Sequence, residues 1–432
     1  MTTFAALGVR PPHLDRLAGM GIATATPVQV AAIPPLLAGR DCVIQSPTGS
    51  GKTLAYLLPL VSRLGGHRPG RPRGLVLAPT RELATQIGGV LGRLGTPLRH
   101  TLVFGGVGYA GQISGLRSAD VVIACPGRLL DLCTGGSAAL GSVEVLVLDE
   151  ADEMLDAGFA RDVEKLIAIT SRRTSSVPRQ TLLASATMPA WVAEMARSHL
   201  HDPARVVVEP TRAPDLEHGL VAVRRDERTA MLSQLLARSS STIVFHRTKH
   251  GAKKLARDLS ARGHRTAELQ GNLSQAARDR AIAAFRGRQA SVLVATNVAA
   301  RGIDVEQVTL VVNYELPDTA DWLTHRVGRT ARNGASGRAL TFLTEDDGER
   351  WQKLRRLGAP DLQLVDADHL VLTGTMRFMP GAPRVAVSSR VAAPAGRGPA
   401  GGARGGPGRP RPSLPGAARR RRGGGRPSSA TL

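Results

Sequence analysis

Short apolar runs alternate with helical patterns over residues 40–208 of this 432-residue chain. The segments between the runs, such as 51–64 and 80–94, place apolar residues three and four positions apart. Fully apolar strands separated by amphipathic helices predict a parallel sheet that is covered on both faces. The runs are DCVIQS (41–46), GLVLAP (74–79), HTLVFGG (100–106), ADVVIACP (119–126), VEVLVLDE (143–150), QTLLASAT (180–187) and ARVVVEP (204–210).

The same alternation begins again after a break at EPTRAPDLEHG (209–219), whose prolines and mixed charges are typical of a linker. Helical patterns such as 249–263 separate the later runs. A second parallel α/β domain is therefore expected. Its runs are STIVFHRT (241–248), HRTAEL (264–269), ASVLVATN (290–297), VTLVVNYELP (308–317) and GRALTFLT (337–344).

Beyond residue 383 the chain is rich in Gly, Pro and Arg and has no hydrophobic periodicity. Such a segment cannot bury enough surface to offset its chain entropy, so we expect it to be disordered. The predicted organisation is a first domain over 1–208, a linker over 209–217, a second domain over 218–360, a connector over 361–383 and the tail over 384–432.

Charge and cysteine content narrow the range of partners. The eleven arginines of the tail carry half of the formal net charge of +22, which favours a polyanionic partner, with nucleic acid ahead of lipid. Cys42, Cys125 and Cys133 lack metal-ligand spacing and predict a reducing compartment. The first residues do not resemble a secretory signal, and no apolar stretch approaches the roughly 18 residues of a membrane span. We expect a soluble cytoplasmic protein.

The segment SPTGSGKT (46–53) follows an apolar run and opens a helical pattern, which is the context of a phosphate-binding loop. Gly49 and Gly51 allow backbone amides to turn towards phosphate oxygens at the helix N-terminus. Lys52 supplies a charge for the β- and γ-phosphates, and the Thr53 hydroxyl suits Mg²⁺. The segment predicts a nucleotide site.

The run VLVLDEADEML (145–155) ends in a cluster of carboxylates. Such acids can simply cap a following helix. Beside a phosphate loop, however, Asp149 is expected to hold Mg²⁺ and Glu150 to orient the attacking water. We expect Glu153 to be an acid of the first helical turn, favoured by the helix dipole.

Asp149-Glu150-Ala151-Asp152 spells the motif of the DEAD-box RNA helicases, and further blocks that resemble this family follow one another from Phe4 to Arg332. The resemblance implies two tandem RecA-like domains, each an α/β unit with a parallel sheet, followed here by the basic tail. It also implies RNA-stimulated ATP hydrolysis coupled to local unwinding or remodelling of short RNA duplexes and RNA–protein complexes. ATP and Mg²⁺ are the expected cofactors.

The resemblance assigns a set of nucleotide contacts. Gln29, in GIATATPVQ (21–29), is expected at the adenine edge, where its amide would reject guanine, and Phe4 is expected nearby. The chain also has no Asn-Lys-x-Asp run that would read guanine. Asp304 is expected at the ribose. The full set of nucleotide-binding residues is Phe4, Gln29, Thr48, Gly49, Ser50, Gly51, Lys52, Thr53 and Asp304.

The RNA contacts implied by the resemblance lie in both domains and address the sugar–phosphate backbone of single strands and short duplexes rather than base edges. Gln270 and Asn297 stand where the family commonly has histidine and aspartate. The expected RNA-binding residues are Thr80, Arg81, Gly105, Gly106, Pro126, Gly127, Arg128, Gly271, Gln275, Arg278, Thr296 and Arg301.

Two further groups complete the resemblance. Asp152, Ser185 and Thr187 are expected to couple hydrolysis to strand separation. Arg326 and Arg329, in HRVGRTAR (325–332), stand three apart and are expected to share one helix face and to stabilise charge on the γ-phosphoryl group.

Alternatives remain at this level. They are a DNA translocase of the same ATPase superfamily, a non-catalytic RNA chaperone whose basic tail anneals strands, and a GTPase switch. The sequence does not identify the target RNA or protein partners, and we expect a monomer.

Overall fold

The computed structural model describes residues 2–68, 70–170, 178–209, 215–297, 308–331 and 335–379. The predicted tail over 384–432 lies outside the described residues, as do positions 210–214 of the predicted linker. Among the described residues, no helix is long and apolar enough to cross a membrane.

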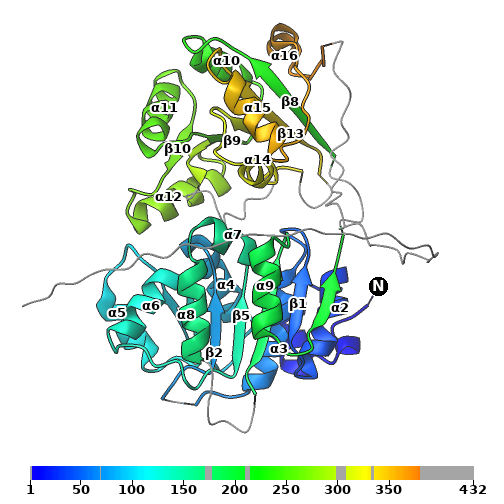
Figure 1. Cartoon of the computed structure of the whole chain (residues 1–432), viewed down its shortest axis with the longest axis vertical. Coiled ribbons are helices and arrows are strands. Elements are labelled where there is room, and N and C mark those ends of the chain that lie inside the picture. Colours follow the sequence, from blue (N-terminus) through cyan, green and yellow to red (C-terminus); the bar gives the residue numbers. More distant parts are fainter. Residues whose placement is uncertain are drawn as a thin grey trace, which may run out of the picture. The chain divides into compact units, whose positions relative to one another are not determined.

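The first sheet contains seven parallel strands in the order β3-β4-β2-β5-β6-β1-β7 (Figure 1). Each strand lies within one of the predicted apolar runs. The strands are β1 (Cys42–Gln45), β2 (Gly74–Leu77), β3 (His100–Val103), β4 (Val121–Ala124), β5 (Val145–Leu148), β6 (Gln180–Ser185) and β7 (Ala204–Val207).

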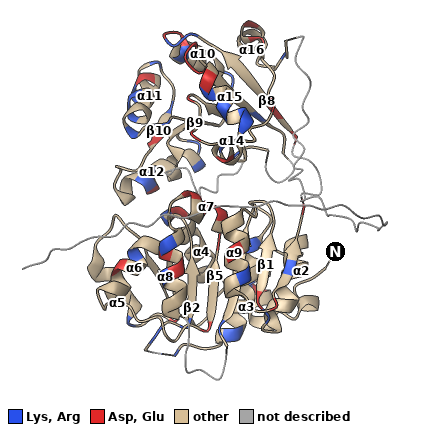
Figure 2. Ribbon diagram, in the orientation of Figure 1, with Lys and Arg blue, Asp and Glu red and all other residues tan. Residues whose placement is uncertain are grey.

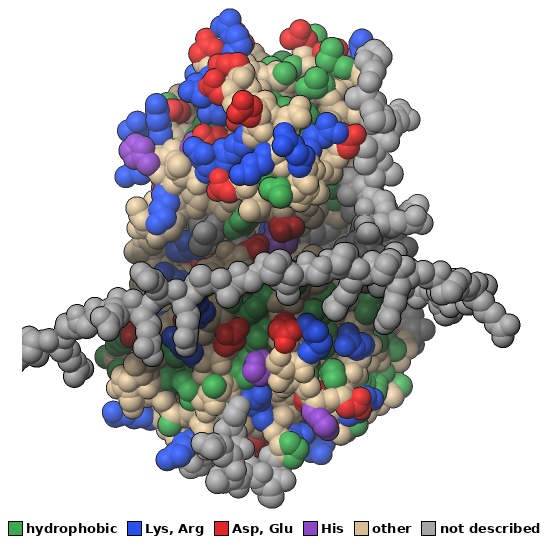
Figure 3. All heavy atoms as spheres, in the orientation of Figure 1, with side chains coloured by type: hydrophobic (Ala, Val, Ile, Leu, Met, Phe, Trp, Pro, Cys, Tyr) green, Lys and Arg blue, Asp and Glu red, His purple; other side chains and the backbone are tan. Residues whose placement is uncertain are grey.

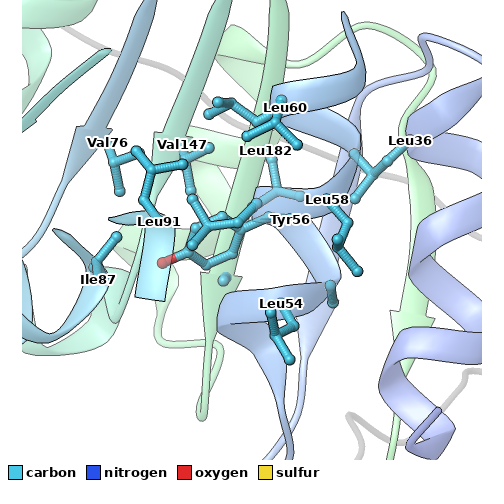
Figure 4. Packing of buried hydrophobic residues seen from close by; sticks show 14 of the residues in the cluster. Leu36, Leu54, Tyr56, Leu58, Leu60, Val76, Ile87, Leu91, Val147 and Leu182 are labelled. Atoms are coloured by element: carbon cyan, nitrogen blue, oxygen red, sulfur yellow. The ribbon is translucent and has the colours of Figure 1, made fainter. Parts of the chain in front are cut away.

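Alternate residues of these strands enter two different cores, because successive side chains of a strand point to opposite faces. Ile44 and Val76 pack with residues of α2, α3 and α4, as Figure 4 shows for part of this cluster. Val43 and Leu75 pack with residues of α6, α8 and α9 on the other face. The predicted double-sided cover of the first sheet is confirmed.

Helices follow the strands as predicted. A short 3₁₀ turn, η1 (Ala5–Leu7), opens the chain. The first-domain helices are α1 (Pro11–Gly19), α2 (Pro27–Leu37), α3 (Lys52–Leu64), α4 (Arg81–Arg93), α5 (Tyr109–Leu116), α6 (Pro126–Thr134), α7 (Ala151–Asp156), α8 (Ala160–Thr170) and α9 (Ala190–His199).

The second sheet has six parallel strands in the order β10-β11-β9-β12-β13-β8. Its strands are β8 (Leu216–Ala222), β9 (Thr242–Phe245), β10 (Thr266–Leu269), β11 (Val292–Ala295), β12 (Leu310–Asn313) and β13 (Gly337–Leu343). Its helices are α10 (Arg228–Leu236), α11 (Lys249–Ala261), α12 (Gln275–Arg286), α14 (Ala320–Val327), α15 (Gly348–Arg356) and α16 (Ala367–Thr373).

Two segments differ from the sequence-based division. Leu216 and Glu217, placed in the linker, form the start of β8, which pairs with β13 along its whole length. The described part of the predicted connector, residues 361–379, contains α16, whose Leu370 is buried in the core of the second sheet. Both segments therefore contribute to the second α/β unit.

Charged side chains lie mainly on helices and loops, and most strand residues are uncharged (Figure 2). Basic side chains gather over α15 on the face seen in Figure 3, where Lys353, Arg355 and Arg356 are exposed. Because the strands themselves carry few charges, we expect polar groups at the carboxyl ends of the strands. Parallel α/β sheets form their binding sites at those ends.

Candidate functional site

The phosphate loop connects β1 to α3 and folds around the ammonium group of Lys52. The Lys52 Nζ donates hydrogen bonds to the carbonyl oxygens of Ser46 at 2.7 Å and Pro47 at 2.8 Å. Gly49 and Gly51 have φ angles of 81° and 97°, a backbone conformation that favours glycine. Gly51 caps the N-terminus of α3 without a side chain, so the first amides of the helix are suited to an anion.

Asp149 lies directly after β5, with only 3% of its surface exposed. The Tyr56 hydroxyl donates to its Oδ2 at 2.8 Å, and the Glu150 backbone N–H donates to its Oδ1 at 3.0 Å. Burial raises the pKa of Asp149, and the positive charge of Lys52 opposes this shift. Asp149 is therefore a buried carboxylate that depends on its donors and on nearby positive charge.

Glu150 has a φ angle of 50° and caps the N-terminus of the short helix α7. Burial and the charges of Glu153 and Asp149 raise its pKa well above the usual value, while Arg329 and Lys52 act in the opposite direction. Its Oε2 is buried and has no hydrogen-bond partner within the described part of the chain. A buried acceptor of this kind suits a ligand or water that is itself a donor.

These groups line one cavity of about 260 Å³. It brings together predicted nucleotide and catalytic residues from the phosphate loop, from the end of β5 and from the segment after α14. The predicted residues that line it are Thr48, Gly49, Gly51, Lys52, Thr53, Asp149, Glu150 and Arg329. Ile22, from the predicted adenine-reading segment GIATATPVQ (21–29), also lines it. Sequence reasoning did not identify the other lining residues, which are Met20, Leu54, Leu83, Gln86, Val90 and Arg93.

The donor set of this cavity fits a nucleotide with Mg²⁺. The Asp149 carboxylate and the Thr53 hydroxyl are hard oxygen ligands beside a phosphate loop. No cluster of three or more His, Cys, Asp or Glu side chains that would suit a metal occurs in the described residues.

Phe4, Gln29 and Ser50 do not line this cavity. Phe4 is buried in the core beside η1 and α2. The Gln29 amide instead caps α2: its Oε1 accepts from the Thr26 N–H at 2.9 Å, and its Nε2 donates to the Gly51 carbonyl at 3.1 Å. Gln29 thus contacts the phosphate loop, and its contact with adenine stays a prediction. Asp304 lies outside the described residues.

The two predicted arginines occupy different environments. The prediction that they share one helix face is wrong, because α14 ends at Val327 and Gly328 is its C-cap. Arg329 lies beyond the helix, lines the cavity and forms an ion pair with Glu153 at 3.4 Å.

Arg326 does not line the cavity and is only 1% exposed. Its Nε donates to Asn297 Oδ1 at 2.6 Å, and one Nη donates to Asn313 Oδ1 at 3.0 Å and to the Glu315 carbonyl at 2.8 Å. Burial lowers its pKa to about 9. In this structure Arg326 binds groups at the carboxyl ends of strands of the second sheet.

The three predicted coupling residues lie together. Asp152 Oδ2 accepts hydrogen bonds from both the backbone N–H and the hydroxyl of Thr187, each at 2.8 Å. The Asp152 N–H donates to Ser185 Oγ at 3.2 Å. The first turn of α7 is therefore hydrogen-bonded to the end of β6 and to the loop after it.

The predicted RNA contacts of the first domain gather after β2, β3 and β4. Thr80 caps the N-terminus of α4, and Arg81 packs so closely against Gly106 that a Cβ there would lie 2.1 Å from its guanidinium. Arg128 donates to the Val107 carbonyl at 3.0 Å and lies over the ring of Tyr109 at 4.0 Å. Gly105, Pro126 and Gly127 complete this edge.

The predicted RNA contacts of the second domain lie after β10 and β11. Arg278 is 6% exposed and pairs with Glu82, to which its Nε donates at 2.7 Å. Gln275 donates to Asp279 at 3.0 Å. Gly271 lies beside Lys249, and Thr296 is buried after β11. Arg301 lies outside the described residues.

Comparison with known proteins agrees with this geometry. Residues 26–195 match the model of the DEAD/DEAH box helicase family, and residues 227–334 match the helicase conserved C-terminal domain. The chain is 37% identical to the ATP-dependent RNA helicase RhlB of Vibrio campbellii, over 79% of this chain and 81% of that protein. The chain belongs to the DEAD-box helicase family.

Other DEAD-box relatives differ in length. The ATP-dependent RNA helicase DeaD of Mycobacterium tuberculosis is 40% identical over 79% of this chain, but the match spans only 61% of DeaD. The ATP-dependent RNA helicase DbpA of Escherichia coli is 39% identical over 81% of this chain and 77% of DbpA. The common part is thus the two-sheet core.

Solved DEAD-box structures share the fold. Dbp5 of Saccharomyces cerevisiae, bound to RNA and ADP BeF₃, is 29% identical and superposes with a TM-score of 0.73, covering 85% of this chain and 97% of Dbp5. This likeness supports the prediction of two tandem RecA-like domains.

Proposed function

We propose that this DEAD-box protein is an ATP-dependent RNA helicase that couples RNA-stimulated ATP hydrolysis to local unwinding of short RNA duplexes and remodelling of RNA–protein complexes. The observation that carries the proposal is the single cavity that joins Lys52, Asp149, Glu150 and Arg329. Phosphoryl transfer to water requires a loop that binds phosphates, a carboxylate that can hold a metal ion, an acid that can orient the water and an arginine that stabilises charge.

Each of these residues has a separate task in the proposal. Lys52 and the first amides of α3 bind the phosphates of ATP. Thr53 and Asp149 would hold Mg²⁺, which when bound supplies charge neutralisation on the phosphates. Glu150 accepts a proton from the attacking water through its unpartnered oxygen, and Arg329 stabilises negative charge on the transferred group.

RNA would be held by the glycine and arginine edge of the first domain and by the residues after β10 and β11. Such backbone contacts carry little sequence information. The pair of hydrogen bonds from Thr187 to Asp152 supports a route by which nucleotide state reaches the RNA side. ATP and RNA would then favour the same conformation, and hydrolysis would release it.

The decisive experiment compares ATP hydrolysis with RNA, with DNA and without nucleic acid. Stimulation by RNA alone is expected, whereas stimulation by DNA would favour a translocase. Preference for GTP would favour a switch protein.

Lys52→Ala should abolish both hydrolysis and duplex separation, because the phosphates lose their cation. The exposed Lys165→Ala on α8 is the matched control. If Lys52→Ala left duplex remodelling intact, a non-catalytic RNA chaperone would be the correct reading.

The arginine-rich tail is proposed as a sequence-independent RNA anchor. Removing residues 384–432 takes away eleven arginines and should flatten the salt dependence of RNA binding while ATP binding stays unchanged. An unchanged slope of binding against salt concentration would contradict this part of the proposal.

A further inference from the structure

Tyr56 lies within the hydrophobic core of the first sheet yet carries a polar group towards the active site. Its side chain is 2% exposed and is surrounded by apolar residues such as Val147 and Leu182 (Figure 4). Packing alone would be served equally well by phenylalanine. The hydroxyl must find a partner because an unpaired buried donor is unfavourable.

That partner is part of the proposed cation site. The Tyr56 hydroxyl donates to Asp149 Oδ2 at 2.8 Å. Tyr56 stands four residues after Lys52 and three after Thr53 on α3, so the three side chains lie on neighbouring positions of one helix surface. The phenol therefore contacts Asp149, one of the two residues proposed to hold Mg²⁺, from the helix that carries the other, Thr53.

We propose that Tyr56 is a positioning residue for the divalent cation, holding the Asp149 carboxylate in the orientation in which it binds the metal. This inference rests on the nucleotide-binding part of the proposed function and is independent of RNA.

The hydrogen bonding of Asp149 explains how this works. Tyr56 occupies a lone pair of Oδ2, and the Glu150 N–H occupies one of Oδ1. A carboxylate has about four acceptor positions, so others remain for a cation or its water. Two donors from different elements, α3 and the end of β5, fix the plane of the carboxylate before any ligand binds. Partners of this kind orient metal ligands and affect metal affinity.

The test is Tyr56→Phe in the full chain, which keeps the ring and removes the hydroxyl. Divalent-cation affinity is measured without RNA, by titrating Mg²⁺ into protein with a fluorescent ADP analogue and by electron paramagnetic resonance of Mn²⁺. We expect the cation affinity of the variant to fall about 10–100-fold, while binding of the analogue in EDTA is unchanged.

Tyr314→Phe is the matched control, because the Tyr314 hydroxyl also has a hydrogen bond, to Thr229 at 2.8 Å, but lies in the second domain. Its cation affinity should equal that of the unaltered chain. Equal affinity in Tyr56→Phe would overturn the proposal.

A double-mutant cycle separates positioning from general damage to the fold. On an Asp149→Asn background the carboxylate is gone, so adding Tyr56→Phe should cause no further loss of cation affinity. A further loss as large as in the unaltered chain would overturn the proposal. If RNA failed to stimulate hydrolysis while the cation titration shifted as expected, the helicase proposal would fail and this inference would stand.

Discussion

The acidic end of β5 and the basic helix α14 both bury charged side chains, but they do so in different ways. Glu150 lines the cavity, and its Oε2 has no partner among the described residues. Arg326 is more deeply buried, at 1% exposure, and it makes three hydrogen bonds, to Asn297, Asn313 and the Glu315 carbonyl, away from the cavity; its second Nη has no partner among the described residues. Burial of a charge therefore does not by itself mark a reacting group.

The two side chains differ in whether they line the cavity, which Glu150 does and Arg326 does not. The pKa of Glu150 is raised by burial and by like charges, which leaves an acid prepared to exchange a proton with a ligand. The pKa of Arg326 is lowered by burial, but neutral acceptors hold its guanidinium in the sheet edge. In this structure the first region lines the cavity, and the second is held by hydrogen bonds to residues that follow β11 and β12 or end β12.

Alanine substitution of the two arginines tests this contrast with the largest expected effects. Arg329→Ala should reduce ATP hydrolysis on the order of 10³–10⁵-fold, because charge on the transferred group is no longer stabilised. Arg326→Ala should lower the free energy of unfolding by about 2–4 kcal/mol, since several buried acceptors lose their donor. Hydrolysis rates and thermal unfolding measure the two effects, and the opposite pattern would refute the distinction.

Glu150→Gln sharpens the acidic side of the comparison. The amide keeps the shape of the side chain but cannot accept the proton of water, so hydrolysis should fall about 10²–10⁴-fold. Binding of a fluorescent ATP analogue should be retained. Glu194→Gln, on the exposed face of α9, is the control. Normal turnover by Glu150→Gln would remove Glu150 from its assigned role.

His218 provides a test on the structural side. Its Nε2 lies 3.0 Å from Thr341 Oγ1, which also accepts from Asn313, the partner of Arg326. Burial lowers the pKa of His218 to about 3. The unfolded chain binds this proton near pH 6.5, so stability from His218 is complete above that pH and is lost as the pH falls towards about 3.

The stability of the unaltered chain should therefore decline between pH 6.5 and pH 4.5 more steeply than that of His218→Gln. Chemical unfolding at both pH values measures the slopes. His250→Gln, an exposed residue on α11, should behave like the unaltered chain. Parallel slopes for His218→Gln and the unaltered chain would argue against a buried neutral imidazole.

The smallest effect is expected where the two functions meet. Thr187→Val removes the hydroxyl hydrogen bond to Asp152 but keeps the one from the backbone. The free energy of unfolding should fall by about 1 kcal/mol, and duplex separation should be reduced more than ATP hydrolysis. Thr134→Val at the exposed end of α6 is the control. Equal reductions in both activities would mean that the contact does not couple them.

The sequence predicts most of the strands because their apolar runs are buried on both faces. It misses β8, since Glu217 and His218 interrupt the apolar pattern there and prolines precede it. The buried His218 forms a hydrogen bond with Thr341 of the adjacent strand, and this contact spans 123 positions. Such pairings cannot be seen in a local pattern.

The phosphate loop and the β5 acids are also predictable from the sequence, because each is a local motif whose residues are neighbours in the chain. Tyr56 is not, because a tyrosine in an apolar helix looks like a core residue and its partner Asp149 is 93 positions away. The contact of Gln29 with Gly51 is likewise not visible in a local pattern, because the two residues are 22 positions apart. Gly328 could have been used to predict the end of α14, because glycine often follows the last residue of a helix. That prediction would have placed Arg326 in the helix and Arg329 beyond it.

The left-handed backbone of Glu150 has a consequence for engineering. A φ of 50° is unfavourable for a residue with a Cβ by about 1–2 kcal/mol, and glycine would relieve it. Local conformational preference and chemistry thus make opposite demands on this position. Stability engineering guided by backbone conformation would replace Glu150 with glycine early. The resulting protein should be more stable and should bind ATP without hydrolysing it.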